Sequence, residues 1–486
     1  MRIQVFAFFL LVSTALFSQE QLGLRLENYA GVSSLALNPA GNLTNPLKWD
    51  VNLIGGGLFV ENNYAFIQNT GLLDLLKTKG GTSFVLAGSL EGQAPSNAKL
   101  VDFFTNQPNR RNVTTSVFLA GPSAAFRIGE RHSVGVFTHF RYHSAAQNVP
   151  YEFSYYDYSQ RAFNDPFTVQ PFEAALTAWS EIGLNYAFKM PSGDGDLGFG
   201  VNVRFLQAYE GAFVENLEPF SYNKLPGDTV QFDHPHGRFA YTFSNLQGNS
   251  PALQQNGGGM AFDLGVIKTF DAEGDGYRLR LGASLLDLGY LHFDKNAAAH
   301  EINPDLIALL GVNDFKKFDA PEKTDEYVKV FSQQITGDSL ASYQGDAFKI
   351  ALPAAFSLQA DYSLTPNLFI NGTWVQRIPM PGVSSRRSDL LAVAPRFEHR
   401  WFSASAPLSI YNWNRVHAGF AARLAFLVIG TDNLPSIIGQ RRFTGTDFYF
   451  ALKINAFDLG HHLSGMGGGS GKRRYGGKGK VKCYDF

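Results

Sequence analysis

The sequence predicts an all-β fold: a transmembrane antiparallel β-barrel of about 14 strands, with a short N-terminal plug and long extracellular loops. Three observations predict it. Apolar residues alternate with polar or small ones along many segments of roughly nine to fourteen residues, a length that crosses a bilayer at a tilt. Short Gly/Asp turns alternate with long connections. Aromatic residues make up 14% of the chain and charged residues only 17%.

The N-terminus predicts export. Residues 1–19 have the pattern of a signal peptide, with a positive charge at Arg2 and an apolar stretch from Val5 to Phe17. This stretch is far shorter than the ~20 residues that a spanning helix needs. The only cysteine is Cys483, which excludes a disulfide within the chain. A net charge of −1 gives no indication of nucleic-acid binding.

The clearest predicted hairpin lies between residues 182 and 205. Apolar residues occupy the even positions from Ile182 to Phe188 and, after the turn at residues 192–196, the odd positions from Leu197 to Phe205. The same alternation recurs at residues 260–285, 356–374, 416–428 and 447–455, and it defines a barrel over residues 49–458. A soluble β-sandwich would also alternate, but its strands average only about five or six residues.

The polar faces of these strands carry charges of both signs. The residues that we expect to face the lumen are Glu181, Lys189, Arg204, Arg278, Arg280, Asp361, Arg423, Asp447 and Lys453, with Arg396, Glu398 and Arg400 as further candidates. Unpaired charge inside a narrow barrel is costly. A mixed lining therefore indicates internal salt bridges that close the lumen, rather than a selective pore. Tyr277 is expected on the opposite, outer face, as part of an aromatic girdle.

Four long connections are expected outside the membrane. They are residues 72–112, with a short helix at Leu72–Lys77; residues 143–171, which are rich in aromatic side chains; residues 209–256; and residues 291–349, with a helix from Asp305 to Leu310 after Asn303-Pro304. Their combined length could form a lid or a face that binds a partner.

Residues 459–486 differ from the rest of the chain. A glycine-rich linker at residues 465–471 precedes a run of basic residues: Lys472, Arg473, Arg474, Lys478, Lys480 and Lys482. We expect a flexible periplasmic tail. One interpretation is a solvated end of the chain, and the other is an electrostatic tether to an acidic protein, an anionic lipid or a cell-wall polymer.

The segment at residues 20–48 is not strand-like. It contains Asn38-Pro39-Ala40-Gly41 after a stretch of small residues. This motif resembles the N-terminal hatch of the long-chain fatty-acid transporter family of outer-membrane barrels. The resemblance implies that residues 20–48 plug a fourteen-stranded barrel and that the protein lies in the cell outer membrane.

A broader resemblance is to an uncharacterised Bacteroidetes family of outer-membrane barrels, a domain of unknown function. The segments that carry it are residues 38–40, 352–356, 400–402, 406–408, 429–434 and 445–449. Related barrels of that phylum serve type IX secretion and gliding. The resemblance therefore implies a fold and a compartment without a substrate.

No enzyme, cofactor or metal site is predicted. Residues 233–236 (Asp-His-Pro-His) and His461-His462 lack the three or four converging ligands of a metal site, and no Gly-x-Ser-x-Gly motif occurs. The leading hypothesis is a hatch-plugged outer-membrane transporter of small hydrophobic molecules. The alternative is an accessory barrel of a type IX secretion or other envelope complex that acts through protein–protein contacts. Outer-membrane lipid is an expected partner in either case, and nucleic acid is not.

Overall fold

The computed structural model describes residues 20–77, 84–86, 98–104, 111–154, 162–245, 253–271, 276–304, 307–315 and 324–455. The predicted signal peptide and the basic tail, with Cys483, lie outside these residues. Among the described residues, no helix is both long enough and apolar enough to span a membrane.

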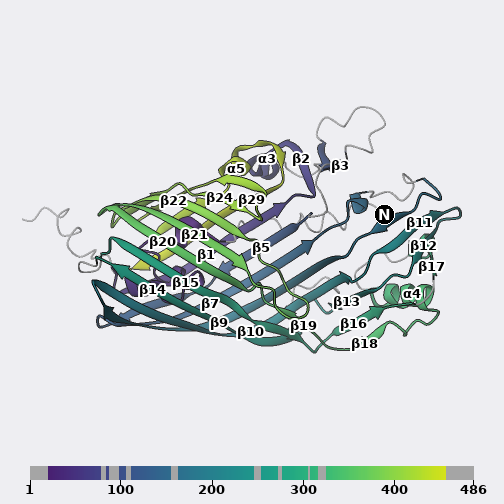
Figure 1. Ribbon diagram of the computed structural model, residues 1–486, viewed down its shortest axis with the longest axis horizontal. Coiled ribbons are helices and arrows are strands. Elements are labelled where there is room, and N and C mark those ends of the chain that lie inside the picture. The colour runs from purple at the N-terminus through teal and green to yellow at the C-terminus, as the bar shows by residue number, and fades with distance from the viewer. Residues whose placement is uncertain are drawn as a thin grey trace, which may run out of the picture. The chain divides into compact units, whose positions relative to one another are not determined.

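The described chain folds mainly into one antiparallel sheet that closes on itself (Figure 1). Its barrel strands are β1 (Trp49–Asn62), β5 (Val113–Ala120), β6 (Ser123–Ile128), β7 (His132–Gln147), β9 (Phe172–Ser192), β10 (Gly195–Asn216), β14 (Gly257–Phe270), β15 (Leu279–Phe293), β19 (Phe348–Ala351), β20 (Ala355–Thr365), β21 (Leu368–Arg377), β22 (Leu390–Glu398), β23 (Phe402–Ser405), β24 (Leu408–Tyr411), β25 (Arg415–Ala418), β26 (Phe420–Leu424), β27 (Leu427–Thr431) and β29 (Gly445–Asn455). The last strand, β29, pairs with β1 from Asp50↔Asn455 to Glu61↔Gly445, which closes the sheet.

Four pairs of these segments each act as one interrupted strand: β5 with β6, β19 with β20, β23 with β24, and β25 with β26. Counted in this way, the barrel has 14 strands, as predicted. Three of the interruptions contain a proline, Pro122, Pro353 or Pro407. A proline has no N–H to donate to the ladder, so the strand breaks there.

The two faces of the wall have opposite character. On β9, Ile182, Leu184 and Tyr186 are 49–56% exposed, whereas Glu181 and Asn185 between them are buried. The same alternation on the other strands gives an apolar outer surface and a polar inner one. This is the pattern of a barrel that faces lipid outside and a lumen inside.

The two ends of the barrel differ. At the short-turn end, connections such as residues 129–131, 193–194 and 366–367 join neighbouring strands directly. The long-loop end carries β2 (Ala65–Thr70), α3 (Leu72–Lys77), β3 (Phe84–Leu86), β4 (Lys99–Phe103), η4 (Tyr151–Ser154), β8 (Phe167–Val169), β11 (Phe220–Leu225), β12 (Thr229–Asp233), β13 (Gly237–Thr242), β16 (Ala297–Ile302), β17 (Ile307–Gly311), η6 (Val312–Phe315), α4 (Thr324–Thr336), β18 (Tyr343–Gly345), α5 (Leu434–Ile438) and β28 (Gln440–Phe443). These elements include two four-stranded sheets, ordered β17-β12-β11-β8 and β28-β2-β4-β3.

One predicted helix is confirmed and another is wrong. The helix α3 spans Leu72–Lys77, as predicted. The helix predicted from Asp305 to Leu310 is instead the strand β17, at residues 307–311, which pairs with β12. In β17 Ile307 and Leu309 are exposed, and Ala308 and Leu310 pack into a cluster with Ile335 of α4. The strand partner and this packing outweigh the helix-start signal of the preceding proline.

The predicted run of alternation from 416 to 428 is also divided in the structure. It forms β25, β26 and β27, with a tight turn at residues 425–426, where Ala425 has φ +51°. A non-glycine residue rarely adopts this left-handed conformation, so the sequence does not mark the turn.

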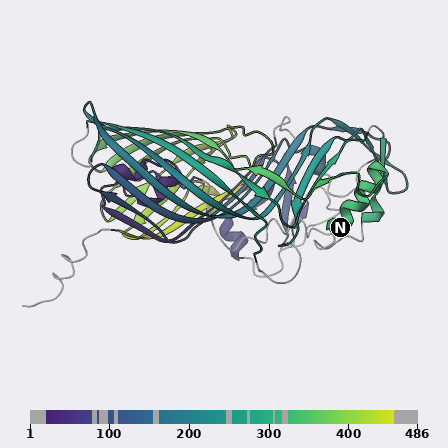
Figure 2. The same ribbon diagram turned by 90° about the horizontal axis from the view of Figure 1, so that it is seen from below.

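Residues 20–48 lie inside the barrel, where they form the short helices α2 (Leu22–Arg25), η1 (Gly31–Ala36) and η2 (Gly41–Thr44) (Figure 2). Leu22, Leu26 and Leu37 belong to one buried cluster with residues of the wall. Val32 and Leu35 belong to another, with Ala125 and Phe137. We call residues 20–48 the plug.

Candidate functional site

The predicted plug motif, Asn38-Pro39-Ala40-Gly41, docks on the inner wall. The side-chain Oδ1 of Asn38 accepts the N–H of Ala40 at 3.0 Å, and its Nδ2 donates to Oε1 of Gln359 at 3.1 Å. From the wall, Asn185 Nδ2 donates to the carbonyl of Pro39 at 2.9 Å. Asn38 Nδ2 also lies within hydrogen-bond distance of the carbonyls of Val266 and Ala283. The turn is therefore built by its own asparagine and fixed by four strands of the wall, β9, β14, β15 and β20.

The wall beneath this turn carries glycines where a side chain would not fit. A Cβ on Gly200 of β10 would lie 2.4 Å from the carbonyl carbon of Pro39, and one on Gly265 of β14 would lie 2.2 Å from Oδ1 of Asn38. Real atoms do not approach this closely. The glycines let the plug backbone rest directly on the β10–β14 side of the lumen.

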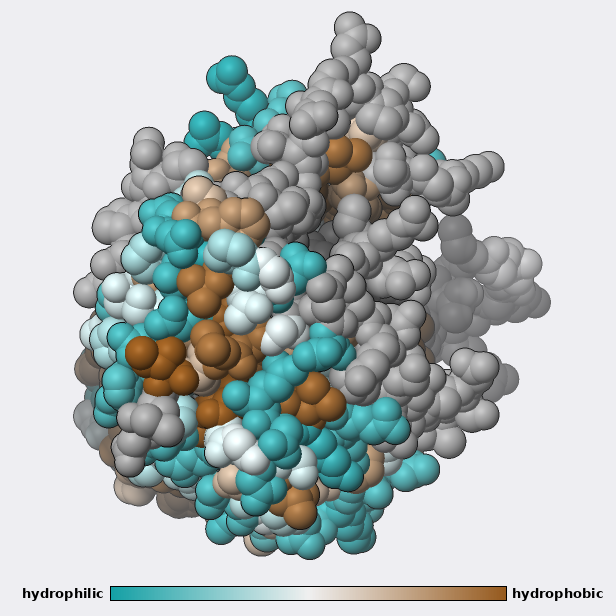
Figure 3. Space-filling model, turned by 90° about the vertical axis from the view of Figure 1, so that its right-hand side faces the viewer, coloured by the Kyte–Doolittle hydropathy of each residue, from teal (hydrophilic) through white to brown (hydrophobic). Residues whose placement is uncertain are grey.

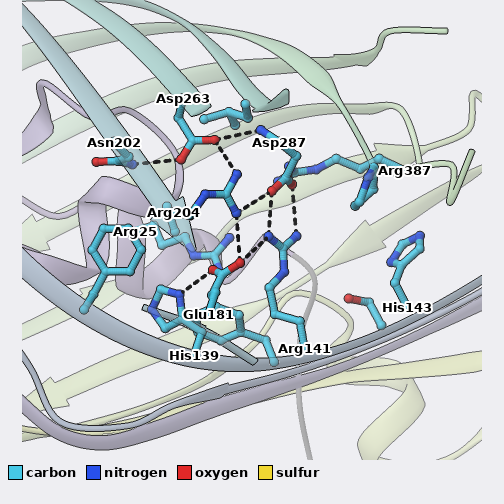
Figure 4. A pocket seen from close by; sticks show the side chains of 16 residues that line it. Arg25, His139, Arg141, His143, Glu181, Asn202, Arg204, Asp263, Asp287 and Arg387 are labelled. Carbon is cyan, nitrogen blue, oxygen red and sulfur yellow. Dashed lines mark hydrogen bonds and ion pairs between the residues drawn. The ribbon is translucent and has the colours of Figure 1, made fainter. Parts of the chain in front are cut away.

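A cluster of buried charges lies next to the plug, centred on Arg204 of β10 (Figure 4). Its guanidinium group is 3.0 Å from Glu181, 2.7 Å from Asp263 and 2.9 Å from Asp287. Arg141 of β7 lies 2.6 Å from Asp287. The backbone N–H of Asp287 also donates to Asp263 at 2.7 Å, so the two carboxylates are held in place together.

The plug joins this cluster through its first residues. Arg387, in the connection between β21 and β22, donates to both carboxylate oxygens of Glu20 at 2.7 and 2.6 Å and lies 3.3 Å from Asp287. Arg25 is 3.7 Å from Glu20, and its guanidinium carbon lies 5.1 Å from the ring centroid of Phe118. The bidentate ion pair between Arg387 and Glu20 is therefore the main charged contact at this end of the plug.

The pKa values of the two arginines shift in opposite directions, although burial acts to lower both. For Arg25, burial outweighs the attraction of Glu20 and, together with the neighbouring Arg387 and Arg141, lowers the pKa to about 10. For Arg387, burial also acts to lower the pKa, but Glu20 and Asp287 outweigh it and raise the pKa above its ordinary value. Arg387 is thus the more firmly charged partner of Glu20.

Other charged contacts hold the middle of the plug. Glu27 accepts from Arg423 Nε at 2.8 Å. Nearby, Arg396 is paired with Asp361 at 2.8 Å and with Glu398 at 2.7 Å, and all three side chains are buried. Elsewhere on the wall, Asp50 pairs with Lys453 at 3.1 Å and accepts the N–H of Val32 of the plug at 2.9 Å.

The charges of the cluster around Arg204 balance. It contains as many carboxylates as guanidinium groups: Glu20, Glu181, Asp263 and Asp287 against Arg25, Arg141, Arg204 and Arg387. The plug contributes one group of each sign. An excess charge in such a buried site would cost several kcal/mol. If Glu20 and Arg25 leave with the plug, the wall residues of the cluster still have equal numbers of carboxylates and guanidinium groups.

Two pockets lie between the plug and the wall. One is lined by the charged cluster together with Phe118, Phe137 and Leu286. The other is smaller and is lined mainly by small and apolar residues of the plug, β1 and β5, among them Leu24 and Ala120. Arg25, Ala36, Phe118 and His139 line both, so the two pockets adjoin.

Most of the predicted lumen residues lie on the inner face. Glu181, Arg204, Asp361, Arg423, Asp447 and Lys453 are buried there. Lys189 is half-buried at the short-turn end, 2.7 Å from Asp196. Arg280 is half-buried, 3.0 Å from Asp361. The further candidates Arg396 and Glu398 are buried and paired with each other, whereas Arg400 is exposed.

Arg278 does not face the lumen, so this prediction is wrong. Its guanidinium group donates to the hydroxyl of Tyr362 on the outer face, and it is Tyr277 that turns inward and donates to Asp361 and Asn28. Strand β15 begins only at Leu279, so the alternation of the strand does not yet apply to these two residues.

Several members of the charged cluster were not predicted from the sequence. Asp287 follows two leucines and has φ +58°, at an irregularity in the β14–β15 pairing that hides its direction. The sequence did not predict which face of its strand Arg141 lies on. Arg387 lies in the connection between β21 and β22, where alternation predicts no direction. Asp263 did carry a signal, because it alternates with outward Phe262 and Leu264.

Among the described residues, no three His, Cys, Asp or Glu side chains are grouped so that they could hold a metal ion. His234 pairs with Asp233 at 2.6 Å, and His236 lies 3.3 Å from Glu218, all near the surface. The second histidine pair, His461-His462, and the predicted tail residues from Lys472 to Lys482 lie outside the described part of the chain.

Residues 39–432 match the family of unknown function DUF5723. The chain belongs to this family. The DUF5723 match covers the wall from β1 to β27 and begins within the plug motif. No curated protein sequence matches the chain significantly.

Several solved barrels are similar to this DUF5723 chain at low identity. The TodX deltaS2S3 mutant monoaromatic hydrocarbon channel is 11% identical, with 88% of this chain and 95% of that chain covered and a TM-score of 0.38. The Pseudomonas putida toluene transporter TodX is 9% identical, with 87% and 91% covered and a TM-score of 0.32. A Pseudomonas aeruginosa FadL homologue is 10% identical, with 90% and 99% covered and a TM-score of 0.25. The barrel assignment depends on the strand pairing itself.

Proposed function

We propose that the chain is an outer-membrane channel for small hydrophobic molecules, closed at rest by its own residues 20–48. The long loops face the exterior and the short turns the periplasm, which is the usual asymmetry of such barrels. The apolar outer wall supports a membrane location, and the lumen supports passage through the protein.

One observation carries the proposal: two adjoining pockets remain between the plug and the wall. Gly200 and Gly265 bring the plug backbone against β10 and β14. Next to Phe118 of β5 and His139 of β7, which line both pockets, space remains between plug and wall. A local rearrangement of the plug around Arg25 and Ala36, which line both pockets, joins and widens them.

The lining of the smaller pocket supports a hydrophobic cargo. Leu24, Val32, Phe118, Ala120 and Ala451 contribute to it. Apolar surface of this kind favours an apolar solute by about 25 cal/mol per Å² removed from water.

A pocket-filling substitution tests this proposal. Ala36 is half-buried and lines both pockets, so A36F is expected to fill them, and A36S is the matched control that leaves them open. Cells that lack the native protein and carry either variant at equal surface level are compared for uptake of small hydrophobic compounds and of glucose. We expect A36F, but not A36S, to reduce hydrophobic uptake towards that of cells without the protein. Equal uptake by both variants would refute the pockets as the route.

A second candidate, an accessory barrel of an envelope complex, is favoured by one feature of the long-loop end. Figure 3 shows hydrophobic side chains gathered between hydrophilic ones on this end. Ile307 and Leu309 of the edge strand β17 are each 53% exposed. Exposed apolar groups beside an unpaired strand edge are typical of protein contacts. Native mass spectrometry of gently extracted protein separates the candidates, since a small hydrophobic ligand that the A36F variant does not retain supports the channel and stoichiometric protein partners support the accessory barrel.

A further inference from the structure

The short helix α5 is attached to the outer surface of the barrel wall. Its Ser436 is fully buried, and the Ser436 hydroxyl lies 3.0 Å from that of Thr446 on β29. On β29 the odd-numbered residues Tyr449 and Lys453 are buried in the lumen, so Thr446, at an even position, belongs to the outer face. Thr446 is only 4% exposed because α5 covers it.

The helix α3 is held against α5 by a glycine contact. A Cβ on Gly71, at the start of α3, would lie 2.6 Å from both the Cα and the N of Gly439, directly after α5. Only two glycines allow this backbone approach, and Gly439 also has φ +122°. The two helices therefore form one unit on the wall, as Figure 1 shows. We call α3 and α5 the helix pair.

The helix pair exposes large aliphatic side chains. Leu73 and Leu76 of α3 are 43% and 51% exposed, and Ile438 of α5 is 68% exposed. The neighbouring β24–β25 hairpin, which contacts α5, adds Trp413 at 57% and Val416 at 75%. This apolar surface continues along the outer face of the wall into the lipid-facing band. Its continuity with that band identifies lipid as the occupant.

Cations lie beside the helix pair. Arg441 and Arg442 are exposed on β28, the strand that directly follows α5. The guanidinium carbon of Arg442 lies 5.1 Å from the ring centroid of Phe66 and 5.7 Å from that of Phe104. The guanidinium carbon of Arg415 lies 4.7 Å from the same Phe104 centroid. Stacking holds the Arg442 guanidinium group in place while leaving it available to an anion.

We propose that the helix pair and β28 form a binding face for an outer-leaflet lipid with an anionic, phosphate-bearing headgroup. The acyl chains lie on Leu73, Leu76 and Ile438, and the headgroup meets Arg441 and Arg442. The proposal rests on the membrane placement and orientation given under Proposed function, and is independent of what the barrel transports. Guanidinium groups are well suited to phosphate, because they donate two parallel hydrogen bonds.

The first test asks whether lipid covers the helix pair. With Cys483 replaced by serine, single cysteines at Leu76 and Ile438 are labelled with a fluorophore in nanodiscs that contain spin-labelled phosphatidylcholine. Ile370, on the lipid-facing wall and 40% exposed, is the positive control, and Leu309 at the long-loop end is the negative control. We expect quenching at 76 and 438 to approach that at 370. Quenching no greater than at 309 overturns the proposal.

The second test asks whether the cations select the headgroup. The R441Q/R442Q variant is compared with R131Q, which removes an exposed arginine at the short-turn end. Nanodiscs contain phosphatidylglycerol and phosphatidylcholine, and native mass spectrometry counts the lipids retained. We expect the double variant to retain phosphatidylglycerol about fivefold less tightly for each cation removed, and R131Q to behave as the native protein. Equal retention by both variants overturns the headgroup assignment. A36F leaves both readouts unchanged, so failure of the channel proposal and failure of this one are separately visible.

Discussion

At the scale of single residues, the contacts that hold the start of the plug are unequal. Glu20 is fully buried and receives two hydrogen bonds from Arg387, whereas Arg25 lies 3.7 Å away. Burial already disfavours the charge of Arg25. A buried carboxylate that loses its main partner is strongly destabilising, whereas Glu20 keeps both hydrogen bonds from Arg387 when Arg25 is replaced.

We therefore expect R387M to lower the free energy of unfolding by about 3 kcal/mol or more, and R25M to lower it by clearly less. The measurement is urea unfolding of the detergent-refolded barrel, followed by tryptophan fluorescence. Methionine keeps the length and apolar bulk of both side chains, so the two variants control for each other. Similar losses in both would contradict the unequal roles assigned to the two arginines.

A second residue-scale prediction concerns Asp432, in the connection after β27. Burial and the neighbouring Asp447 raise its pKa well above the ordinary range, and Glu20 acts in the same direction. Asp432 accepts from the N–H of Leu22 of the plug at 3.2 Å and from the hydroxyl of Tyr449 at 3.1 Å. The folded state thus binds a proton that the unfolded chain releases above about pH 4.

The folded state holds more protons than the unfolded state above that pH, so stability falls as pH rises through the raised pKa of Asp432. We expect the melting temperature to decline from mildly acidic to alkaline pH, and D432N to decline less. Replacing the exposed Asp346 by asparagine is the control and keeps the native slope. Identical slopes for D432N and the native chain would show that this carboxyl group does not titrate in the folded protein.

At the scale of elements, the hairpins with glycine or aspartate turns could be predicted from the sequence, because alternation fixes the face and the turn residues fix the register. The β9–β10 hairpin and the helix α3 are examples. Two other turns could not be predicted. Asn412 and Trp413 form one, with φ +48° and +56°, and Ala425 forms the other. Of these three residues, only the asparagine favours the left-handed backbone conformation.

The candidate site was predictable only in part, for the same reason. Charges on regular alternating strands, such as Glu181 and Arg204, could be assigned to the lumen. Asp287 at an irregular pairing and Arg387 in a connection could not, since nothing local fixes their direction. The close contact of the plug with Gly200 and Gly265 could not be predicted either, because the need for glycine at these positions comes from the plug residues that pack against them.

The element-scale prediction concerns the plug itself. Without residues 20–48, Arg141, Arg204 and Arg387 remain paired with Glu181, Asp263 and Asp287, so this part of the wall keeps its charge balance. We expect a barrel that lacks residues 20–48 to fold and to conduct ions stepwise in planar bilayers, where the full chain is silent. A folded, heat-modifiable variant without conductance would show that the plug is not what closes the lumen.

At the scale of the whole molecule, closure of the barrel is complete before the basic tail begins. The strand β29 pairs with β1 up to Asp50↔Asn455, and the predicted tail starts after it, at residue 459. The fold and the tail can therefore be separated by experiment. A run of cations after a glycine-rich linker is suited to bind an acidic partner across a flexible span.

We expect deletion of residues 465–486 to leave the melting temperature of the barrel unchanged within error, because no strand pairing of the wall is lost. If the chain is a channel, hydrophobic uptake also stays unchanged. If it is an accessory barrel that holds partners through the tail, co-purified proteins are lost in the deletion variant. They are retained in a control whose linker, residues 465–471, is replaced by a serine-rich segment of equal length. Retention of the same partners by the deletion variant would exclude the tail as their attachment and direct the search to the long-loop end.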